Sequence, residues 1–136
     1  MVRRISTHDH GSSFMYIGID LGTSGVKCLL IDDNQKIIAS THAALSVSRP
    51  HSGWSEQAPQ DWVEATENAL DQLASEQPKF ISTVKGIGFS GQMHGATLLD
   101  VSDNVLRPCI LWNDTRSHEE AAQMDANPAF RKISGN

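Results

Sequence analysis

The residues best suited to chemistry stand in one short stretch near the amino end. A lone carboxylate, Asp20, ends an apolar run and meets a turn, Gly22–Gly25, whose Thr23 and Ser24 carry hydroxyls. Lys27 adds a positive charge shortly after. Successive turn N–H groups form a concavity that suits a phosphate, and a carboxylate beside it can hold Mg²⁺ or a water on it. We interpret the stretch as a phosphate and metal site; an ordinary glycine-rich hairpin with a solvated aspartate is the alternative.

The two glycines of this turn, Gly22 and Gly25, are expected to serve the backbone. Glycine adopts positive φ angles at no steric cost and lets a ligand approach the main chain closely. The turn is therefore predicted to present its N–H groups openly.

A second group of polar residues lies between two glycines further along the chain. The amide of Gln92 and the imidazole of His94 can both hydrogen-bond hydroxyl groups, and Met93 between them offers an adaptable apolar surface. Such a mixture recognises polyols. The alternative is a histidine whose hydrogen bonds are satisfied within a glycine-rich turn.

The elements that must position these residues begin with three strands. Apolar runs and polar turns predict strands at Met15–Asp20, Val26–Asp32 and Lys36–Leu45, joined by short turns into an antiparallel meander. A loop over Ser46–Ala58 then leads to a helix over Pro59–Gln77, which a proline opens and Pro78 ends. Its buried stripe is expected at Trp62, Thr66, Ala69, Leu70 and Leu73.

Beyond the helix, the pattern returns to strands. We expect Val84–Phe89 to pair in parallel with the first strand, followed by strands at Ala96–Leu99 and Cys109–Trp112 and a helix over Thr115–Asp125. Ligands bind at the carboxyl ends of strands in open α/β sheets, where Gln92 to His94 would lie. The order β-β-β-α-β predicts an α/β domain of the ribonuclease-H-like class with a mixed sheet.

The composition excludes some classes of function. The chain has 136 residues, enough for one domain, with 11 basic and 16 acidic residues and a formal net charge of −5. That balance provides no general attraction to nucleic acid or to an anionic membrane, and no apolar run is long enough to cross a bilayer. Cys28 and Cys109 are expected to be buried free thiols in a reducing compartment, so we expect a cytoplasmic protein. Residues 1–13 are interpreted as a tag or disordered tail, and 14–136 as the folded part.

Several stretches of this sequence resemble one family. Gly18–Lys27 resembles the first phosphate loop of the sugar-kinase, chaperone and actin superfamily, and its sequence is similar to the form of this motif in the FGGY carbohydrate kinases. Ser90–Asp100 and Leu106–Arg116 are similar to the branch of that family that acts on D-xylulose, as are Ser48–His51 and Trp54–Gln57. The resemblance covers residues 15 to 136.

This resemblance implies transfer of a phosphoryl group from ATP, with Mg²⁺, to D-xylulose to give D-xylulose 5-phosphate. Asp20 would be the catalytic residue beside the metal. The other implied roles are ATP-phosphate contacts for Thr23, Ser24 and Lys27, sugar contacts for Gln92, Met93 and His94, and the wall and rim of the sugar pocket for Trp112, Asn113 and Asp114.

The resemblance also has a limit. Family members continue with a second domain that holds the general base and the adenosine site, so we expect an N-terminal portion that alone is not an efficient kinase. Asp114 is the only candidate base near the sugar motif, and it is disfavoured.

Exposed apolar surface is expected to cause self-association or a homodimer. The remaining alternatives are a kinase of another pentulose or polyol and a non-catalytic sugar- or phosphate-binding module. A chaperone- or actin-like ATPase is disfavoured because it has no use for Gln92, Met93 and His94.

Overall fold

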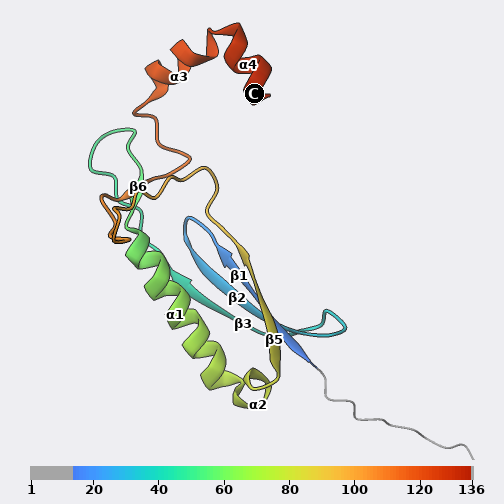
Figure 1. The fold of residues 1–136 in the computed structure, drawn as a ribbon. Helices are drawn as coiled ribbons and strands as arrows, with labels where there is room; N and C mark the ends of the chain where they lie inside the picture. The colour runs from blue at the N-terminus through green and yellow to red at the C-terminus, as the bar shows by residue number, and fades with distance from the viewer. Residues whose placement is uncertain (1–13, 136) are drawn as a thin grey trace, which may run out of the picture.

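A four-stranded mixed sheet forms the centre of the fold. The structure is a computed structural model that describes residues 14–135, so the expected tail at 1–13 lies outside the described residues. The strands are β1 (Met15–Leu21), β2 (Gly25–Asp32), β3 (Ile37–Ala44) and β5 (Val84–Ser90). Their order in the sheet is β3-β2-β1-β5 (Figure 1). The predicted antiparallel meander of β1, β2 and β3 is confirmed, and so is the parallel pairing of β5 with β1.

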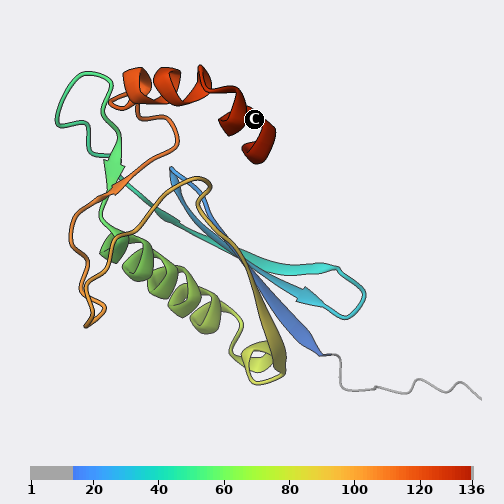
Figure 2. The same ribbon diagram turned by 45° about the horizontal axis from the view of Figure 1, so that its top comes forward.

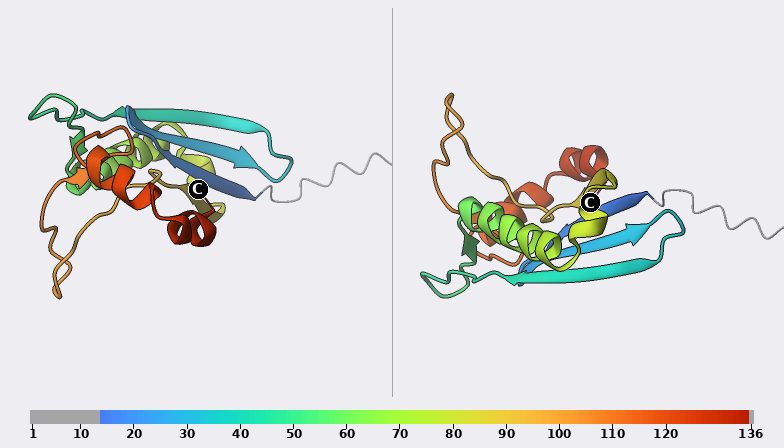
Figure 3. Two further views of the ribbon diagram at one scale, coloured as in Figure 1. Left: turned by 90° about the horizontal axis from the view of Figure 1, so that it is seen from above. Right: turned by 90° about the horizontal axis from the view of Figure 1, so that it is seen from below.

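One long helix covers one face of this sheet. Helix α1 (Pro59–Glu76) lies across the strands (Figure 3) and buries Ala65, Ala69 and Leu73 against them. The sheet contributes alternate residues to the same core, as a pleated strand requires: Met15, Ile17, Ile19, Val26, Cys28 and Leu30. No helix of the described residues covers the opposite face (Figure 3).

The stripe predicted for this helix was partly wrong. Ala65, not Thr66, is buried, while Trp62 and Thr66 flank the core. The Thr66 hydroxyl donates a hydrogen bond to the Trp62 carbonyl oxygen at 2.7 Å. Ala69 and Leu73 are buried as predicted, whereas the burial of Ala65 was not predicted.

A small second sheet joins the two loop regions at one end of the molecule. Strand β4 (Glu56–Gln57), inside the expected loop, pairs antiparallel with β6 (Cys109–Ile110). The remaining helices are α2 (Pro78–Ile81), α3 (His118–Asp125) and α4 (Pro128–Ser134). Figure 2 shows α3 and α4 at the same end of the molecule as β4. Helices α2 and α4 were not predicted.

Two other element predictions need correction. Ala96–Leu99 is not a strand but forms two isolated bridges, Ala96 with Ile110 and Leu99 with Val105, because no neighbouring strand pairs along its length. The helix expected from Thr115 begins only at His118, because the Thr115 N–H donates to the Gly53 carbonyl oxygen at 2.9 Å and so belongs to a loop contact.

Both cysteines are buried and unbridged, as predicted. Burial raises the pKa of the Cys28 thiol, which keeps it protonated and unreactive. Within residues 14–135, no helix is both long and apolar enough to cross a membrane.

Candidate functional site

Asp20 lies near the carboxyl end of β1, on the face of the sheet that α1 does not cover. Its cross-strand neighbours are Lys27 on β2 and Ser90 on β5. Ile19 beside it is buried under α1, so the alternation of the strand turns Asp20 to the open face. Asp20, Lys27 and Ser90 share a hollow of about 420 Å³ with Gly18, Leu29 and Gly88. The hollow thus presents one exposed carboxylate, one cation and one hydroxyl.

The turn between β1 and β2 is built as an open loop of N–H groups. The Gly22 N–H donates to the Gly25 carbonyl oxygen at 3.0 Å, and the Leu45 N–H donates to the Ser24 carbonyl oxygen at 2.9 Å. Among the described residues, the backbone N–H groups of Thr23 and Ser24 donate to no protein acceptor. They can therefore receive an anion.

One of the two reasons expected for the glycines of this turn, a positive φ angle, was wrong. Positive φ angles occur at Gly53 and Gly135 among the described glycines, and at neither Gly22 nor Gly25. Gly25 is instead required by packing. A Cβ atom there would lie 2.3 Å from Nε2 of His42 and 2.6 Å from the carbonyl oxygen of Ala43, both on β3.

The Thr23 hydroxyl joins the turn to both parts of the expected sugar site. It donates to Oε1 of Gln92 at 3.4 Å and accepts from Nε1 of Trp112 at 3.2 Å. The first contact is long and weak, whereas the second has an ordinary length. The fold therefore brings the turn at Thr23 into contact with Gln92 and Trp112.

His94 and Trp112 line a second hollow. This hollow has a volume of about 340 Å³, and its wall also includes Arg107 and Asp114. His94 has a left-handed backbone with a φ of 55°, a conformation in which histidine is enriched relative to most residues. Met93 is 60% exposed and stands outside this hollow.

Asn113 and Ser55 carry buried polar atoms without partners in the described part of the chain. These atoms are Oδ1 of Asn113 and the hydroxyl oxygen of Ser55. Asn113 does not line the second hollow, so the structure does not place it on the rim that the resemblance implied.

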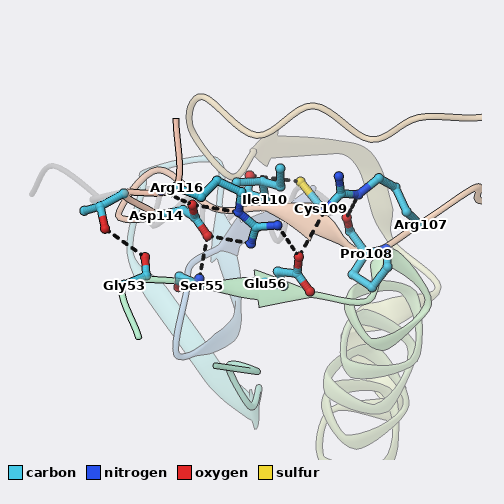
Figure 4. A network of polar contacts seen from close by, with 10 residues as sticks. Gly53, Ser55, Glu56, Arg107, Pro108, Cys109, Ile110, Asp114 and Arg116 are labelled. Atoms are coloured by element: carbon cyan, nitrogen blue, oxygen red, sulfur yellow. Dashed lines mark hydrogen bonds and ion pairs between the residues drawn. The ribbon is translucent and has the colours of Figure 1, made fainter. Parts of the chain in front are cut away.

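The Asp114 carboxylate belongs to an ion-pair network (Figure 4). Its carboxylate accepts from Nη2 of Arg116 and from the Ser55 N–H, each at 2.6 Å. The Asp114 side chain is only 2% exposed. The Arg116 hydrogen bonds hold the pKa of Asp114 well below its usual range. A carboxylate this weakly basic is a poor proton acceptor, which removes Asp114 as a general base.

The same arginine reaches further residues of the network. Nη1 of Arg116 lies 2.7 Å from Oε1 of Glu56, which Arg107 also contacts at 3.0 Å (Figure 4). The guanidinium group stacks over the Trp54 ring at 3.7 Å. Trp54 is thus a packing residue, and the network connects the loop before β4 to the loop after β6.

Sequence reasoning missed Gln57, which lies behind the turn. Its side chain is buried, and its Nε2 donates to the Thr23 carbonyl oxygen at 2.8 Å. The available signal was its place in the Trp54–Gln57 stretch, which the family resemblance included without a role.

A mixed ribonuclease-H-like sheet with an open N–H turn beside a polyol-type loop is typical of the superfamily that contains the sugar kinases. The sequence pattern described as the FGGY family of carbohydrate kinases, N-terminal domain, matches residues 15–136. The chain belongs to the FGGY family of carbohydrate kinases.

Individual relatives agree with this assignment. The chain is 50% identical over 123 residues to a xylulose kinase of Escherichia coli, which covers 90% of this chain and 25% of that protein. A crystal structure described as a xyloylose kinase from Brucella ovis matches with a TM-score of 0.88 and 62% identity, over 90% of this chain and 26% of the other. A xylulose kinase structure from Rhodospirillum rubrum matches with a TM-score of 0.75 and 29% identity, over 82% and 23%. The chain thus spans about a quarter of the length of these relatives, and the expected fold class is confirmed.

Proposed function

We propose that the protein carrying these residues transfers the γ-phosphoryl group of ATP to D-xylulose. The observation that supports this most directly is the junction at Thr23, where the open N–H turn contacts both Gln92 and Trp112. A kinase must hold a phosphate group and a sugar within reach of each other. The relatives named as xylulose kinases indicate which sugar.

The phosphate end of the proposed site is the hollow around Asp20. The free N–H groups of Thr23 and Ser24, with the Lys27 charge, suit the oxygens of ATP phosphates. A single carboxylate fits Mg²⁺, which binds one or two carboxylates and keeps phosphate and water oxygens as its other ligands. When bound, the ion would neutralise charge on the transferred phosphoryl group. Asp20 would hold it there.

The sugar end of the proposed site includes Gln92, Met93, His94 and Trp112. The His94 imidazole faces the second hollow beside Trp112 and can donate or accept a hydrogen bond with a sugar hydroxyl. The Trp112 ring is more than half exposed and offers an apolar wall for carbon-bound hydrogens. Asp114 lines the same hollow, but its oxygens accept hydrogen bonds from Arg116 and Ser55, so it is not itself proposed to contact the sugar.

The test uses a hybrid kinase. Residues 15–135 replace the corresponding quarter of the Escherichia coli xylulose kinase, and phosphorylation of D-xylulose, of other pentuloses and of glycerol is measured with ATP and Mg²⁺. We expect D-xylulose to have the highest kcat/KM. A folded hybrid that prefers another pentulose would assign that sugar instead. A folded hybrid that binds sugar or ATP in calorimetry but transfers no phosphoryl group would favour the binding-module alternative.

A further inference from the structure

The side-chain amide of Gln57 takes part in four hydrogen bonds, although it lines neither the hollow around Asp20 nor the hollow around His94. It is 2% exposed. Its Nε2 donates to the carbonyl oxygens of Thr23 and Ser46, at 2.8 and 3.1 Å. Its Oε1 accepts from Nε1 of Trp62 at 3.0 Å and from Nε2 of Gln92 at 3.4 Å.

These four bonds use the whole capacity of a primary amide, which has two N–H donors and two acceptor positions. The pattern also fixes the orientation of the amide, because the carbonyl oxygens of Thr23 and Ser46 can only accept and the Trp62 indole can only donate. No other side chain of similar size could make the same set. A carboxylate would lack the donors, and a thioether would lack both donors and strong acceptors.

Gln57 also belongs to β4, whose backbone pairs with Cys109 of β6. Five parts of the fold therefore meet at this residue: the Thr23 turn, the loop that follows β3, helix α1, the Gln92 loop and β6. Two of them carry the proposed phosphate and sugar contacts. Trp112, which bonds the Thr23 hydroxyl, lies two residues after the end of β6.

We propose that the side-chain amide of Gln57 is a positioning group that sets the separation between the phosphate turn and the sugar loop. This inference rests on the proposed kinase function. Gln57 would contact neither ATP nor the sugar, so it would act through Thr23 and Gln92. Because small displacements of reacting groups slow catalysis strongly, its loss should affect turnover more than binding.

The first measurement uses the hybrid kinase with Gln57→Met, which keeps the length of the side chain without the amide. We expect kcat to fall about 10- to 100-fold, while the KM values for D-xylulose and ATP change by less than about threefold. Thr41→Val is the matched control, because it removes another buried hydrogen bond, from the Thr41 hydroxyl to the Ala69 carbonyl oxygen at 2.7 Å. It should lower the melting temperature but keep kcat within about twofold of the parent. Equal kcat values for Gln57→Met and the parent would overturn the proposal.

A second variant, Gln57→Glu, tests the donor role. Burial beside two carbonyl oxygens should raise the pKa of the introduced carboxyl, and its protonated form can again donate to one of them. The ratio of its kcat to that of the parent should therefore rise as the pH is lowered from about 8 to about 6, whereas the ratio for Gln57→Met should stay level. A level ratio for both variants would contradict the donor role.

A third measurement does not depend on kinase activity. In NMR spectra of the 136-residue chain, Gln57→Met should shift the indole N–H signal of Trp112 and accelerate its hydrogen exchange, although Trp112 does not touch Gln57. The Trp62 indole, which loses its partner directly, reports that the bond was removed, and Thr41→Val should change neither signal. If the unsubstituted hybrid phosphorylates no ketose, the proposed function fails and this comparison alone decides on Gln57. An unchanged Trp112 signal would then reject the positioning role.

Discussion

The indole N–H of Trp112 donates to the hydroxyl of Thr23 across a separation of 89 residues. The same indole ring lines the hollow that contains His94. One side chain thus forms a wall of the proposed sugar site and a contact of the proposed phosphate turn, so that a ligand moving Trp112 would also move Thr23.

Replacing Asp20 with asparagine should lower kcat of the hybrid kinase by about 100-fold or more, because the charge that holds the metal is needed most in the transition state. The melting temperature should change little, since the side chain is exposed on the open face. Steady-state kinetics over a range of Mg²⁺ concentrations measures this effect. Asp71→Asn, on the exposed side of α1, is the control and should leave kcat unchanged. A near-normal rate for the Asp20 variant would remove Asp20 from the site.

Replacing His94 with alanine should raise the KM for D-xylulose by a factor that corresponds to about 1–3 kcal/mol, because a sugar hydroxyl would lose its partner. The KM for ATP should stay nearly constant. His94→Asn should recover part of the loss, because asparagine tolerates the left-handed backbone at this position and keeps a polar group. If both variants only lower the melting temperature and leave the KM for D-xylulose unchanged, His94 is a structural residue.

Asp114→Asn should lower the free energy of unfolding by about 1–3 kcal/mol at pH 7, because the charge-assisted bonds to Arg116 are lost. The folded-state pKa of Asp114 lies below its unfolded value of about 3.9. Its contribution is therefore complete above that pH and is lost as the pH falls toward the folded-state pKa.

Urea unfolding between about pH 6 and pH 2.5 measures this dependence. Stability of the unsubstituted chain should fall more steeply with acid than stability of Asp114→Asn. Asp125→Asn breaks the exposed pair with Arg131 and is the matched control, which should change both quantities much less. Parallel curves for the chain and its Asp114 variant would show that the ion pair contributes nothing.

Gly25→Ala should destabilise the chain by about 1–3 kcal/mol, since the added methyl group would meet the Ala43 carbonyl oxygen, which belongs to the β3 backbone and cannot rotate away. Gly18→Ala is the control in the same sheet, because its Cβ would meet nothing within 4 Å. Thermal and urea unfolding of both variants test the difference. Equal stability of the two variants would show that β3 adjusts freely.

The chain should self-associate through the outer edge of β5. Phe89 is 72% exposed and Ile87 is 53% exposed on this strand, and Phe89 borders an apolar groove of about 430 Å³ beside Val63 of α1. Edge strands with exposed apolar residues pair readily, and lysine on such an edge opposes pairing. Sedimentation over a concentration series should therefore show less association for Phe89→Lys than for Ile133→Lys on α4. A monomer at all concentrations would contradict this expectation.

The sequence predicted the sheet and α1 well, because those elements depend on local patterns. Alternating apolar residues mark β1 and β2, and Pro59 and Pro78 mark the limits of α1 within about one residue. Ala96–Leu99 was misassigned because a strand needs a partner along its length, and the apolar pattern carries no information about that partner. Strand β4 was missed because two residues are too few to show the alternation of apolar and polar side chains that marks a strand.

The proposed site was predictable where residues act through their own chemistry. Asp20 and His94 could be selected as candidates from their types, their neighbours and the family resemblance, and their roles stay predictions. Gln57 could not be, because its role comes from four partners spread over four other parts of the chain. Asp114 was expected at the rim of the sugar pocket, and it does line the hollow beside His94. That its oxygens accept hydrogen bonds from Arg116 and Ser55 is evident only from the tertiary structure.

The strand order β3-β2-β1-β5 also dictates a sequence of events during folding. Ile17 pairs with Leu30 across a short hairpin, whereas the chain between Ile17 and its other partner, Ile87, includes the whole of β3 and α1. Contacts between residues near in the chain close small loops and form early, whereas distant pairings wait for the entropy of a large loop to be offset. The Asp20 side of the site can therefore assemble with the meander, while Ser90 and the Gln92 loop join it last. Hydrogen exchange during refolding should protect the amides of β2 before those of β5.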